Sequence, residues 1–229
     1  MSLSPELIRS YNTPAPRYTS YPTIPVWENN VSDSNWDILV KKAFQTYGDK
    51  EGITLYIHFP FCESLCTYCG CNKRITKNHG VESPYVATLL QEWKQYLLLF
   101  DQKPKLAGIH LGGGTPTFFS PAALFEILYT IIHASDVLLD AEFSFEGHPN
   151  NTSFEHLQTL AKLGFDRVSY GIQDFDISVQ QAIHRIQPFE RVRVATLNAR
   201  TLGYSSINFD LIYGCLTKLK NLSWIPSEK

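Results

Sequence analysis

From residue 53 onward, the sequence alternates between short runs rich in β-branched and aromatic residues and longer segments with helical spacing. Such alternation is typical of βα units and a parallel sheet. The predicted strands are residues 53–59, 106–112, 142–147, 167–173 and 207–214. The predicted helices are residues 82–100, 121–133, 153–163 and 188–202. A doubly wound open sheet and a partial (β/α) barrel both fit this α/β pattern, because periodicity alone does not separate them.

Local sequence signals support where several of the predicted helices start and end. Serine followed by proline favours a helix start, and glycine favours a helix end. The starts are Ser83-Pro84 and Ser120-Pro121, and the ends are Gly164 and Gly203.

Residues 1–50 differ from the rest and are interpreted as an N-terminal extension. Only residues 33–47 show the apolar spacing of a helix, with Ser32 or Asp33 as its cap. The chain starts without the charged and apolar regions of a signal peptide, and no stretch approaches the ~20 apolar residues of a membrane span. We therefore expect a soluble, cytoplasmic protein.

Charge argues against two classes of partner. The 229 residues include 20 basic and 22 acidic residues, for a net charge of −2, and 44% are hydrophobic. This balance provides no broad cationic surface for nucleic acid and no polybasic membrane anchor, whereas the apolar content supports a substantial core. We expect no nucleic-acid partner and no membrane partner.

Polar residues follow the predicted strands where those strands end. Four cysteines follow the first strand, residues 112–116 (GGGTP) follow the second, and Glu146 ends the third. Gln173 ends the fourth strand, and Asp210 lies within the fifth. Because the carboxyl ends of parallel strands meet at one edge of a sheet, a site is predicted there.

Four of the five cysteines fall within ten residues: Cys62, Cys66, Cys69 and Cys71. Such crowding favours metal or redox chemistry over a disulfide framework. The spacing Cys62-x3-Cys66-x2-Cys69 suits three corners of a cubane [4Fe–4S] cluster, with one iron left for a small molecule. The alternative is a structural zinc site made of all four thiolates.

The cysteine spacing and its surroundings resemble a known family. Cys-x3-Cys-x2-Cys after a strand is the signature of radical S-adenosylmethionine (radical SAM) enzymes. The segments LYIHFPFCESLCTYCGCNK, GGGTPTFFSP, YGIQDFD and INFDLIYG are similar to motifs of the oxygen-independent coproporphyrinogen III dehydrogenase family, as is PRYTSYPT near the N-terminus. The leader and Cys71 distinguish this chain from the haem chaperones of the same superfamily, which remain the alternative.

The resemblance implies a [4Fe–4S] cluster, S-adenosylmethionine and a radical SAM barrel. It places the cluster on Cys62, Cys66 and Cys69 and leaves Cys71 unligated. It implies that S-adenosylmethionine is bound by residues on several strands: Tyr56, Tyr68, Gly113, Gly114, Thr115, Glu146, Gln173, Arg185 and Asp210. Without the resemblance, core packing is the favoured interpretation of Tyr56, because it is an alternate residue of a predicted strand.

The resemblance also implies a reaction and partners. The family converts two propionates of coproporphyrinogen III to vinyl groups by oxidative decarboxylation, which gives protoporphyrinogen IX in haem biosynthesis. An electron donor such as a flavodoxin or ferredoxin and a monomeric enzyme are expected, and Arg17 is a candidate for binding propionate.

The family pattern breaks after Gly214, where Leu-Pro-x-Gln-Thr is expected and Cys215-Leu216-Thr217-Lys218-Leu219 stands. Deleting one nucleotide from codons for the expected residues shifts the reading frame and gives residues 214–219 as they stand here. We therefore expect residues 51–214 to form a partial (β/α)6 barrel cut after its fifth strand, residues 215–229 to be an out-of-frame tail, and turnover to be impaired.

Overall fold

The structure is a computed structural model that describes residues 4–11, 26 and 32–212. The chain divides into two units, Met1–Leu39 and Val40–Lys229. Arg17 and the segment 215–229 lie outside the described residues.

The smaller unit contains helix α1 (Pro5–Tyr11) and the start of α2 (Asp33–Ala43). Ser32 is the cap of α2, because its hydroxyl accepts a hydrogen bond from the Asn35 amide at 3.3 Å. In the larger unit the chain continues through a π-helical turn, Phe44–Gly48, and the short helix α3 (Asp49–Glu51).

The larger unit contains a five-stranded sheet in which every neighbouring pair is parallel. Its strands, in spatial order, are β1 (Ile53–Phe59), β4 (Lys105–Gly113), β5 (Asp136–Gly147), β6 (Arg167–Gln173) and β7 (Ser206–Leu211). A second, two-stranded sheet pairs β2 (Phe61–Cys62) with β3 (Arg74–Ile75).

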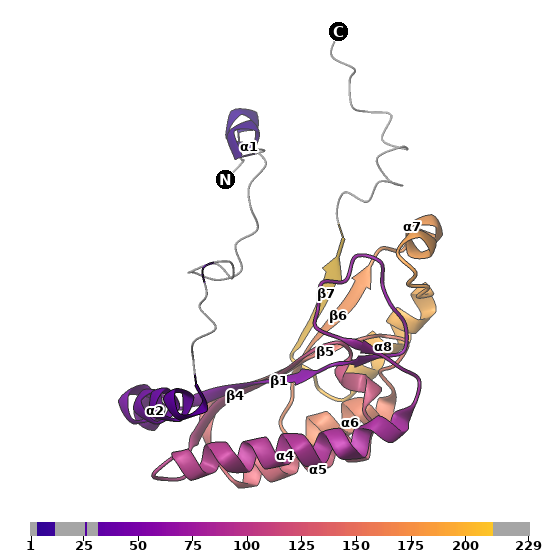
Figure 1. Ribbon diagram of the computed structural model, residues 1–229. Coiled ribbons are helices and arrows are strands. Elements are labelled where there is room, and N and C mark those ends of the chain that lie inside the picture. The colour runs from indigo at the N-terminus through magenta and orange to yellow at the C-terminus, as the bar shows by residue number, and fades with distance from the viewer. Residues whose placement is uncertain (1–3, 12–25, 27–31, 213–229) are drawn as a thin grey trace. The chain divides into compact units, whose positions relative to one another are not determined.

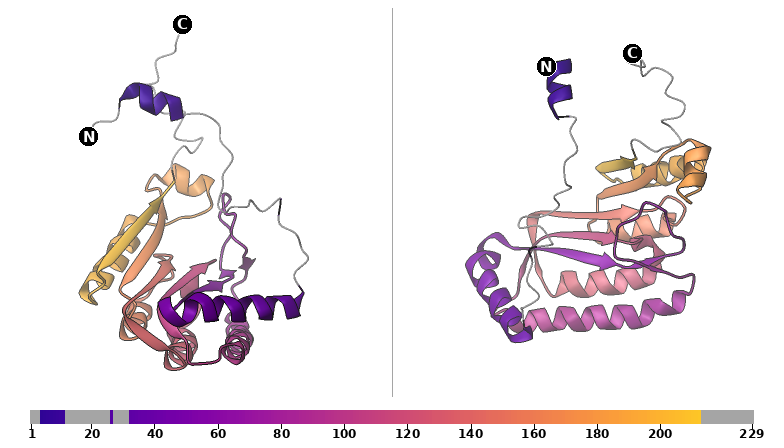
Figure 2. Two further views of the ribbon diagram at one scale, coloured as in Figure 1. Left: turned by 90° about the vertical axis from the view of Figure 1, so that its left-hand side faces the viewer. Right: turned by 45° about the horizontal axis from the view of Figure 1, so that its top comes forward.

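Helices connect successive strands. They are α4 (Glu82–Leu99), α5 (Pro121–His133), α6 (Phe154–Lys162) and the pair α7 (Ile177–Ala182) and α8 (Phe189–Thr201). Figures 1 and 2 show α4, α5, α6 and α8 along one face of the sheet. Because the strand order follows the chain and these helices stay on one face, the sheet is a partial barrel and not a doubly wound sheet.

The core lies between the sheet and these helices. Its fully buried side chains come from alternate strand positions and from the inward faces of the helices. They include Phe59, Leu111, Phe145, Tyr170, Leu124 and Leu128. The opposite, concave face of the strands carries polar side chains.

The five predicted strands are the strands of the main sheet in the predicted order, whereas the short strands β2 and β3 were not predicted. Two differences concern helix and strand starts. Ser83 does not cap α4, because the helix already begins at Glu82 and Val81 precedes it without a side-chain cap. Strand β5 begins at Asp136, six residues before the predicted start at residue 142. The fifth strand ends at Leu211, before the predicted end at residue 214, and residues 213 and 214 are outside the described residues.

Two predicted stops are confirmed by their backbone conformation, since Gly164 and Gly203 have φ of +94° and +86°. Ser120 caps α5 as predicted and accepts a hydrogen bond from the Ala123 amide. Among the described residues, each helix is too short or too polar to span a lipid bilayer.

Candidate functional site

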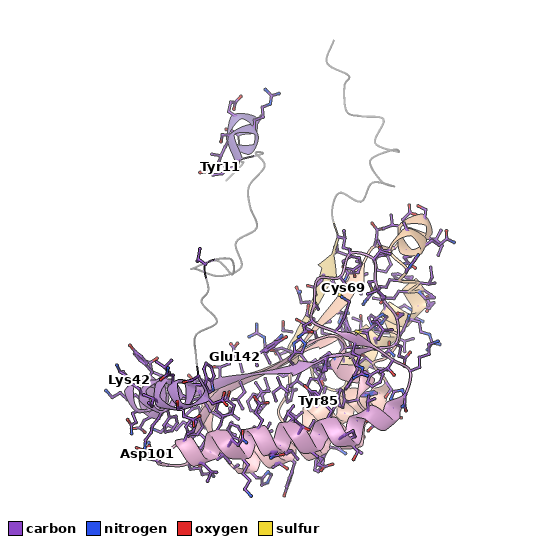
Figure 3. All side chains as sticks on the ribbon, in the orientation of Figure 1. Tyr11, Lys42, Cys69, Tyr85, Asp101 and Glu142 are labelled. Atoms are coloured by element: carbon purple, nitrogen blue, oxygen red, sulfur yellow. The ribbon has the colours of Figure 1, made fainter. Side chains whose placement is uncertain are left out.

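A cavity of about 320 Å³ opens at the carboxyl ends of the parallel strands. Eleven of the twelve predicted site residues line it: Cys62, Cys66, Tyr68, Cys69, Gly113, Gly114, Thr115, Glu146, Gln173, Arg185 and Asp210. In Figure 3, Cys69 is labelled at this end of the sheet, whereas Glu142 lies toward the other end. Residues from the cysteine loop, β4, β5, β6 and β7 therefore meet at one place.

Tyr56 is the predicted residue that does not line the cavity. It lies on β1, and a side chain at Gly112 would meet the Tyr56 ring at 2.8 Å and the Glu146 carboxyl carbon at 3.3 Å. Gly112 therefore leaves the space in which Tyr56 and Glu146 approach each other. The Tyr56 hydroxyl lies 3.1 Å from His58 Nδ1, and His58 Nε2 lies 2.7 Å from the Asn72 carbonyl.

These contacts indicate which atoms of His58 and Tyr56 donate and which accept. A carbonyl only accepts, so His58 Nε2 carries the proton, and in a neutral ring Nδ1 accepts from the Tyr56 hydroxyl. Burial raises the pKa of Tyr56, with Glu146 adding to the effect. Tyr56 is therefore a phenol that contacts His58, and His58 links β1 to the loop after the cysteines.

The cysteine loop is held close to the Gly-rich turn after β4. Cys62 Sγ lies 3.4 Å from Thr115 Oγ1, and the amides of Gly114 and Thr115 donate to the carbonyls of Phe59 and Phe61 at 2.7 and 3.0 Å. A side chain at Gly114 would lie within 3.0 Å of Cys62 Sγ and of these backbone oxygens. The absence of a side chain at this position therefore permits the close approach.

The loop is closed by its own hydrogen bonds. The Cys69 amide donates to the Cys66 carbonyl at 3.1 Å, and Lys73 Nζ donates to the carbonyls of Cys69 and Cys71 at 2.9 and 3.2 Å. Burial raises the pKa of the Cys62 thiol. All four of these thiols are free of disulfides.

Arg185 reaches the cavity from the segment between α7 and α8. One terminal nitrogen lies 3.7 Å from Cys66 Sγ, and the other donates to the Gly171 carbonyl at 2.7 Å. Its Nε atom is buried without a hydrogen-bond partner. Leaving a buried donor without a partner costs free energy. The unpaired Arg185 Nε therefore favours the interpretation that a ligand completes this site.

Backbone strain is also located at this cavity. Gln173 and His184 have φ of +69° and +55°, and both line the cavity. Non-glycine residues rarely adopt the left-handed region, and they cluster at ligand sites when they do.

Two polar networks were not predicted from the sequence. On β4 and β5, His110 Nδ1 lies 2.8 Å from Ser144 Oγ, and His110 Nε2 lies 3.6 Å from the Glu146 carboxylate. The His110 ring also stacks on Tyr56, with centroids 5.9 Å apart. His110 thus contacts two of the predicted binding residues, Tyr56 and Glu146.

On β6 and β7, Ser169 Oγ donates to Asp210 Oδ2 at 2.9 Å, and Asn208 Nδ2 donates to Asp210 Oδ1 at 3.0 Å. Both oxygens of Asp210 are thereby oriented by protein donors. Strand register could have indicated this pairing, because Ser169 and Asn208 are direct neighbours across β6 and β7.

His148 is a further cavity residue, and burial is the main reason that its pKa falls to about 3, with Arg185 adding to the shift. The ring is therefore neutral at neutral pH and interacts with Arg185 without a second positive charge. His148 is not among the twelve predicted site residues.

The donors at this site fit an iron–sulfur cluster. Four thiols line one cavity, among them the three proposed ligands, and the Thr115 hydroxyl and the Arg185 guanidinium both lie near cysteine sulfurs. Within the described part of the chain, no three His, Cys, Asp or Glu side chains lie close enough together to hold a single metal ion. A cubane cluster does not need that grouping, because each thiolate binds a different iron.

Comparison with known proteins agrees with the fold. Residues 56–217 match the family model of the radical SAM superfamily. The chain therefore belongs to the radical SAM superfamily, and this membership implies a [4Fe–4S] cluster and S-adenosylmethionine as cofactors.

Its relatives are more specific. The chain is 41% identical over 229 residues to the oxygen-independent coproporphyrinogen III oxidase of Helicobacter pylori strain J99, a match that covers 96% of this chain and 49% of the relative. It is 38% identical to the enzyme of that name from Pseudomonas aeruginosa, across 91% of this chain and 45% of the relative. The chain spans about half the length of these relatives.

A solved structure gives the same result. Coproporphyrinogen III oxidase (HemN) from Escherichia coli, described as a radical SAM enzyme, matches with a TM-score of 0.78 and 33% sequence identity. The match covers 90% of this chain and 45% of that protein. The five-stranded partial barrel is thus the part of the fold that the two proteins share.

Proposed function

We propose that this chain is a radical SAM enzyme, or the cofactor-binding half of one, that oxidatively decarboxylates two propionates of coproporphyrinogen III to give protoporphyrinogen IX. The observation that supports this most is the meeting of three cysteines and eight other predicted residues at one cavity. The proposed substrate is taken from the names of the relatives.

The predicted residues divide by the part of the cofactors that they are proposed to bind. Cys62, Cys66 and Cys69 hold the cluster and leave one iron without a protein ligand. Gly113 and Gly114 let the backbone approach the amino group of S-adenosylmethionine, while Arg185 donates to its carboxylate.

The remaining polar residues are proposed to bind the nucleoside part of that cofactor. The carboxylates of Glu146 and Asp210 accept hydrogen bonds from donors of the ligand, and Gln173 and Tyr68 complete the wall. Together the two cofactors supply one-electron chemistry that activates a C–H bond of the substrate. The protein orients the target and excludes water.

We also propose the setting of the reaction. An electron carrier such as a flavodoxin or ferredoxin reduces the cluster, and the chain acts as a monomer in the cytoplasm without nucleic-acid or membrane partners.

Anaerobic reconstitution with iron and sulfide tests the proposed function. We expect a brown protein whose broad absorption is bleached by dithionite and which produces 5′-deoxyadenosine from S-adenosylmethionine. Cys66→Ser is expected to abolish iron binding. Cys71→Ser is the matched control, since it removes a thiol of the same loop that is not a proposed ligand, and it should retain the iron. A colourless protein that binds one zinc ion would refute the proposal.

A further inference from the structure

A basic segment adjoins the proposed cluster loop. Residues 72–81 contain Lys73, Arg74, Lys77 and His79 and no carboxylate, although the chain as a whole has a net charge of −2. Arg74 and Lys77 are exposed, and Lys73 is half-buried. The segment therefore presents positive charge to solvent on a chain whose total charge is negative.

Backbone hydrogen bonds connect this segment directly to a proposed cluster ligand. Ile75 on β3 is the strand partner of Cys62 on β2, and the Thr76 amide donates to the Cys62 carbonyl at 2.9 Å. On the other side, Lys73 donates to the Cys69 carbonyl at 2.9 Å. One hydrogen bond thus separates the exposed basic segment from each of two proposed ligands, which is a short path for an electron.

The two exposed cations are not neutralised within the described part of the chain. None of its ion pairs involves Arg74 or Lys77. The neighbouring carboxylates interact with His79, which lies 2.7 Å from Glu82 and 3.8 Å from Glu63. The charges of Arg74 and Lys77 are therefore available to an approaching partner.

These cations also lie outside the cavity. Lys73 lines the cavity, whereas Arg74 and Lys77 do not. A small molecule held in the cavity would contact Lys73, while a surface that includes Arg74 and Lys77 fits a macromolecule that stays outside.

We propose that Arg74 and Lys77 form part of a docking surface for a small acidic electron-carrier protein. This inference rests on the proposed function, in which the cluster takes one electron from outside the chain. In the docked complex the reduced carrier loses one electron and the cluster gains it, with no bond formed or broken. Opposite charges guide the carrier to the surface nearest Cys62 and Cys69 and speed the encounter.

The test compares two variants of equal charge in the full, reconstituted chain. Arg74→Glu/Lys77→Glu reverses two charges at the basic segment, and Lys94→Glu/Arg200→Glu reverses two exposed charges on α4 and α8. Each pair changes the net charge by the same four units, from −2 to −6. The probe is a fully reduced flavodoxin, and stopped-flow bleaching of the cluster absorbance gives the bimolecular rate.

At low ionic strength we expect Arg74→Glu/Lys77→Glu to slow reduction by flavodoxin about tenfold or more, with the difference disappearing near 1 M salt, where screening is strong. Lys94→Glu/Arg200→Glu should remain close to wild type. Arg74→Gln/Lys77→Gln, which neutralises the charges without reversing them, should give an intermediate rate and guards against a local effect of the glutamates on folding.

Dithionite separates this proposal from the proposed function. Bleaching of the wild-type cluster by dithionite supports the proposed function without any docking. If dithionite bleaches all variants and flavodoxin reduces them at equal rates, the docking proposal fails alone. If the segment variants lose affinity for coproporphyrinogen III and keep the wild-type flavodoxin rate, the basic segment binds substrate and the docking proposal is overturned.

Discussion

At the scale of single residues, the site depends on side chains that orient other side chains. Asp210 is a predicted binding residue, and its two oxygens accept hydrogen bonds from Ser169 and Asn208. A carboxylate oriented in this way presents its remaining lone pairs in one direction. Losing one of the two donors frees the carboxylate to rotate and also leaves it less well satisfied.

Ser169→Ala is therefore expected to weaken binding of S-adenosylmethionine to the reconstituted protein by roughly tenfold, or about 1.4 kcal/mol. Isothermal titration calorimetry measures this change. Ser205→Ala is the matched control, because Ser205 donates to Asp166 at 2.6 Å and neither residue lines the cavity. Equal affinities for both variants would show that Ser169 does not act through Asp210.

His148 gives a prediction on pH. Its folded-state pKa of about 3 lies below the ordinary value of 6.5, mainly because the ring is buried and secondarily because Arg185 is close. The unfolded chain therefore binds a proton at higher pH than the folded chain does. The stability that the neutral ring contributes is present above pH 6.5 and is lost as the pH falls toward 3.

Between pH 7 and pH 4.5 this linkage costs about 2 kcal/mol of unfolding free energy. We expect His148→Gln to lose that part of the acid sensitivity, measured by urea unfolding at both pH values. His133→Gln, at an exposed position on α5, should keep the wild-type difference between the two pH values. An unchanged pH dependence in His148→Gln would contradict the prediction.

At the scale of elements, the turn after β4 fits tightly against the cysteine loop. Gly114 lies where a side chain would come within 3.0 Å of Cys62 Sγ and of two backbone oxygens. Backbone atoms cannot move away as a flexible side chain can, so a methyl group here must displace β2 or the turn. Geometry at this junction therefore determines where Cys62 lies.

Gly114→Ala is expected to lower iron loading on reconstitution to less than half of the wild-type content and to destabilise the fold by about 1–3 kcal/mol. Gly70→Ala is the control on the facing cysteine loop, between Cys69 and Cys71, because an added side chain there meets nothing within 4 Å. Iron analysis and thermal unfolding measure both effects. Normal iron content in Gly114→Ala would mean that the junction tolerates displacement.

At the scale of the whole molecule, the larger unit has a buried core and a more exposed cysteine loop. The strands and their helices share one buried core, in which Phe59, Leu111, Phe145 and Tyr170 are fully buried. The cysteine loop contributes mainly exposed or half-buried residues, with Phe61 as its anchor in the core. Protection from hydrogen exchange should therefore differ between these two parts.

We expect cluster loading to slow amide exchange mainly in residues 61–76 and 113–115 and to leave exchange in β4, β5 and β6 nearly unchanged, because the core already protects those strands. Hydrogen–deuterium exchange followed by mass spectrometry, with and without reconstitution, measures this. Slower exchange throughout the sheet would instead mean that the strands depend on the cluster for their folding.

The sequence by itself determined the order and type of the main elements and most of the site. Alternating apolar strands, serine caps and glycine stops are local signals, so β1, β6 and α5 could be predicted closely. The cysteine spacing is also local, and the family resemblance that it carries implied the other site residues. Eleven of the predicted residues line one cavity.

The tertiary structure decided what depends on residues far apart in the chain. Sequential strand order with helices on one face established a barrel, which periodicity could not separate from a doubly wound sheet. The roles of His110 and Ser169 follow from strand register, which brings them beside Glu146 and Asp210. Burial lowers the pKa of His148, and burial depends on how the whole chain packs.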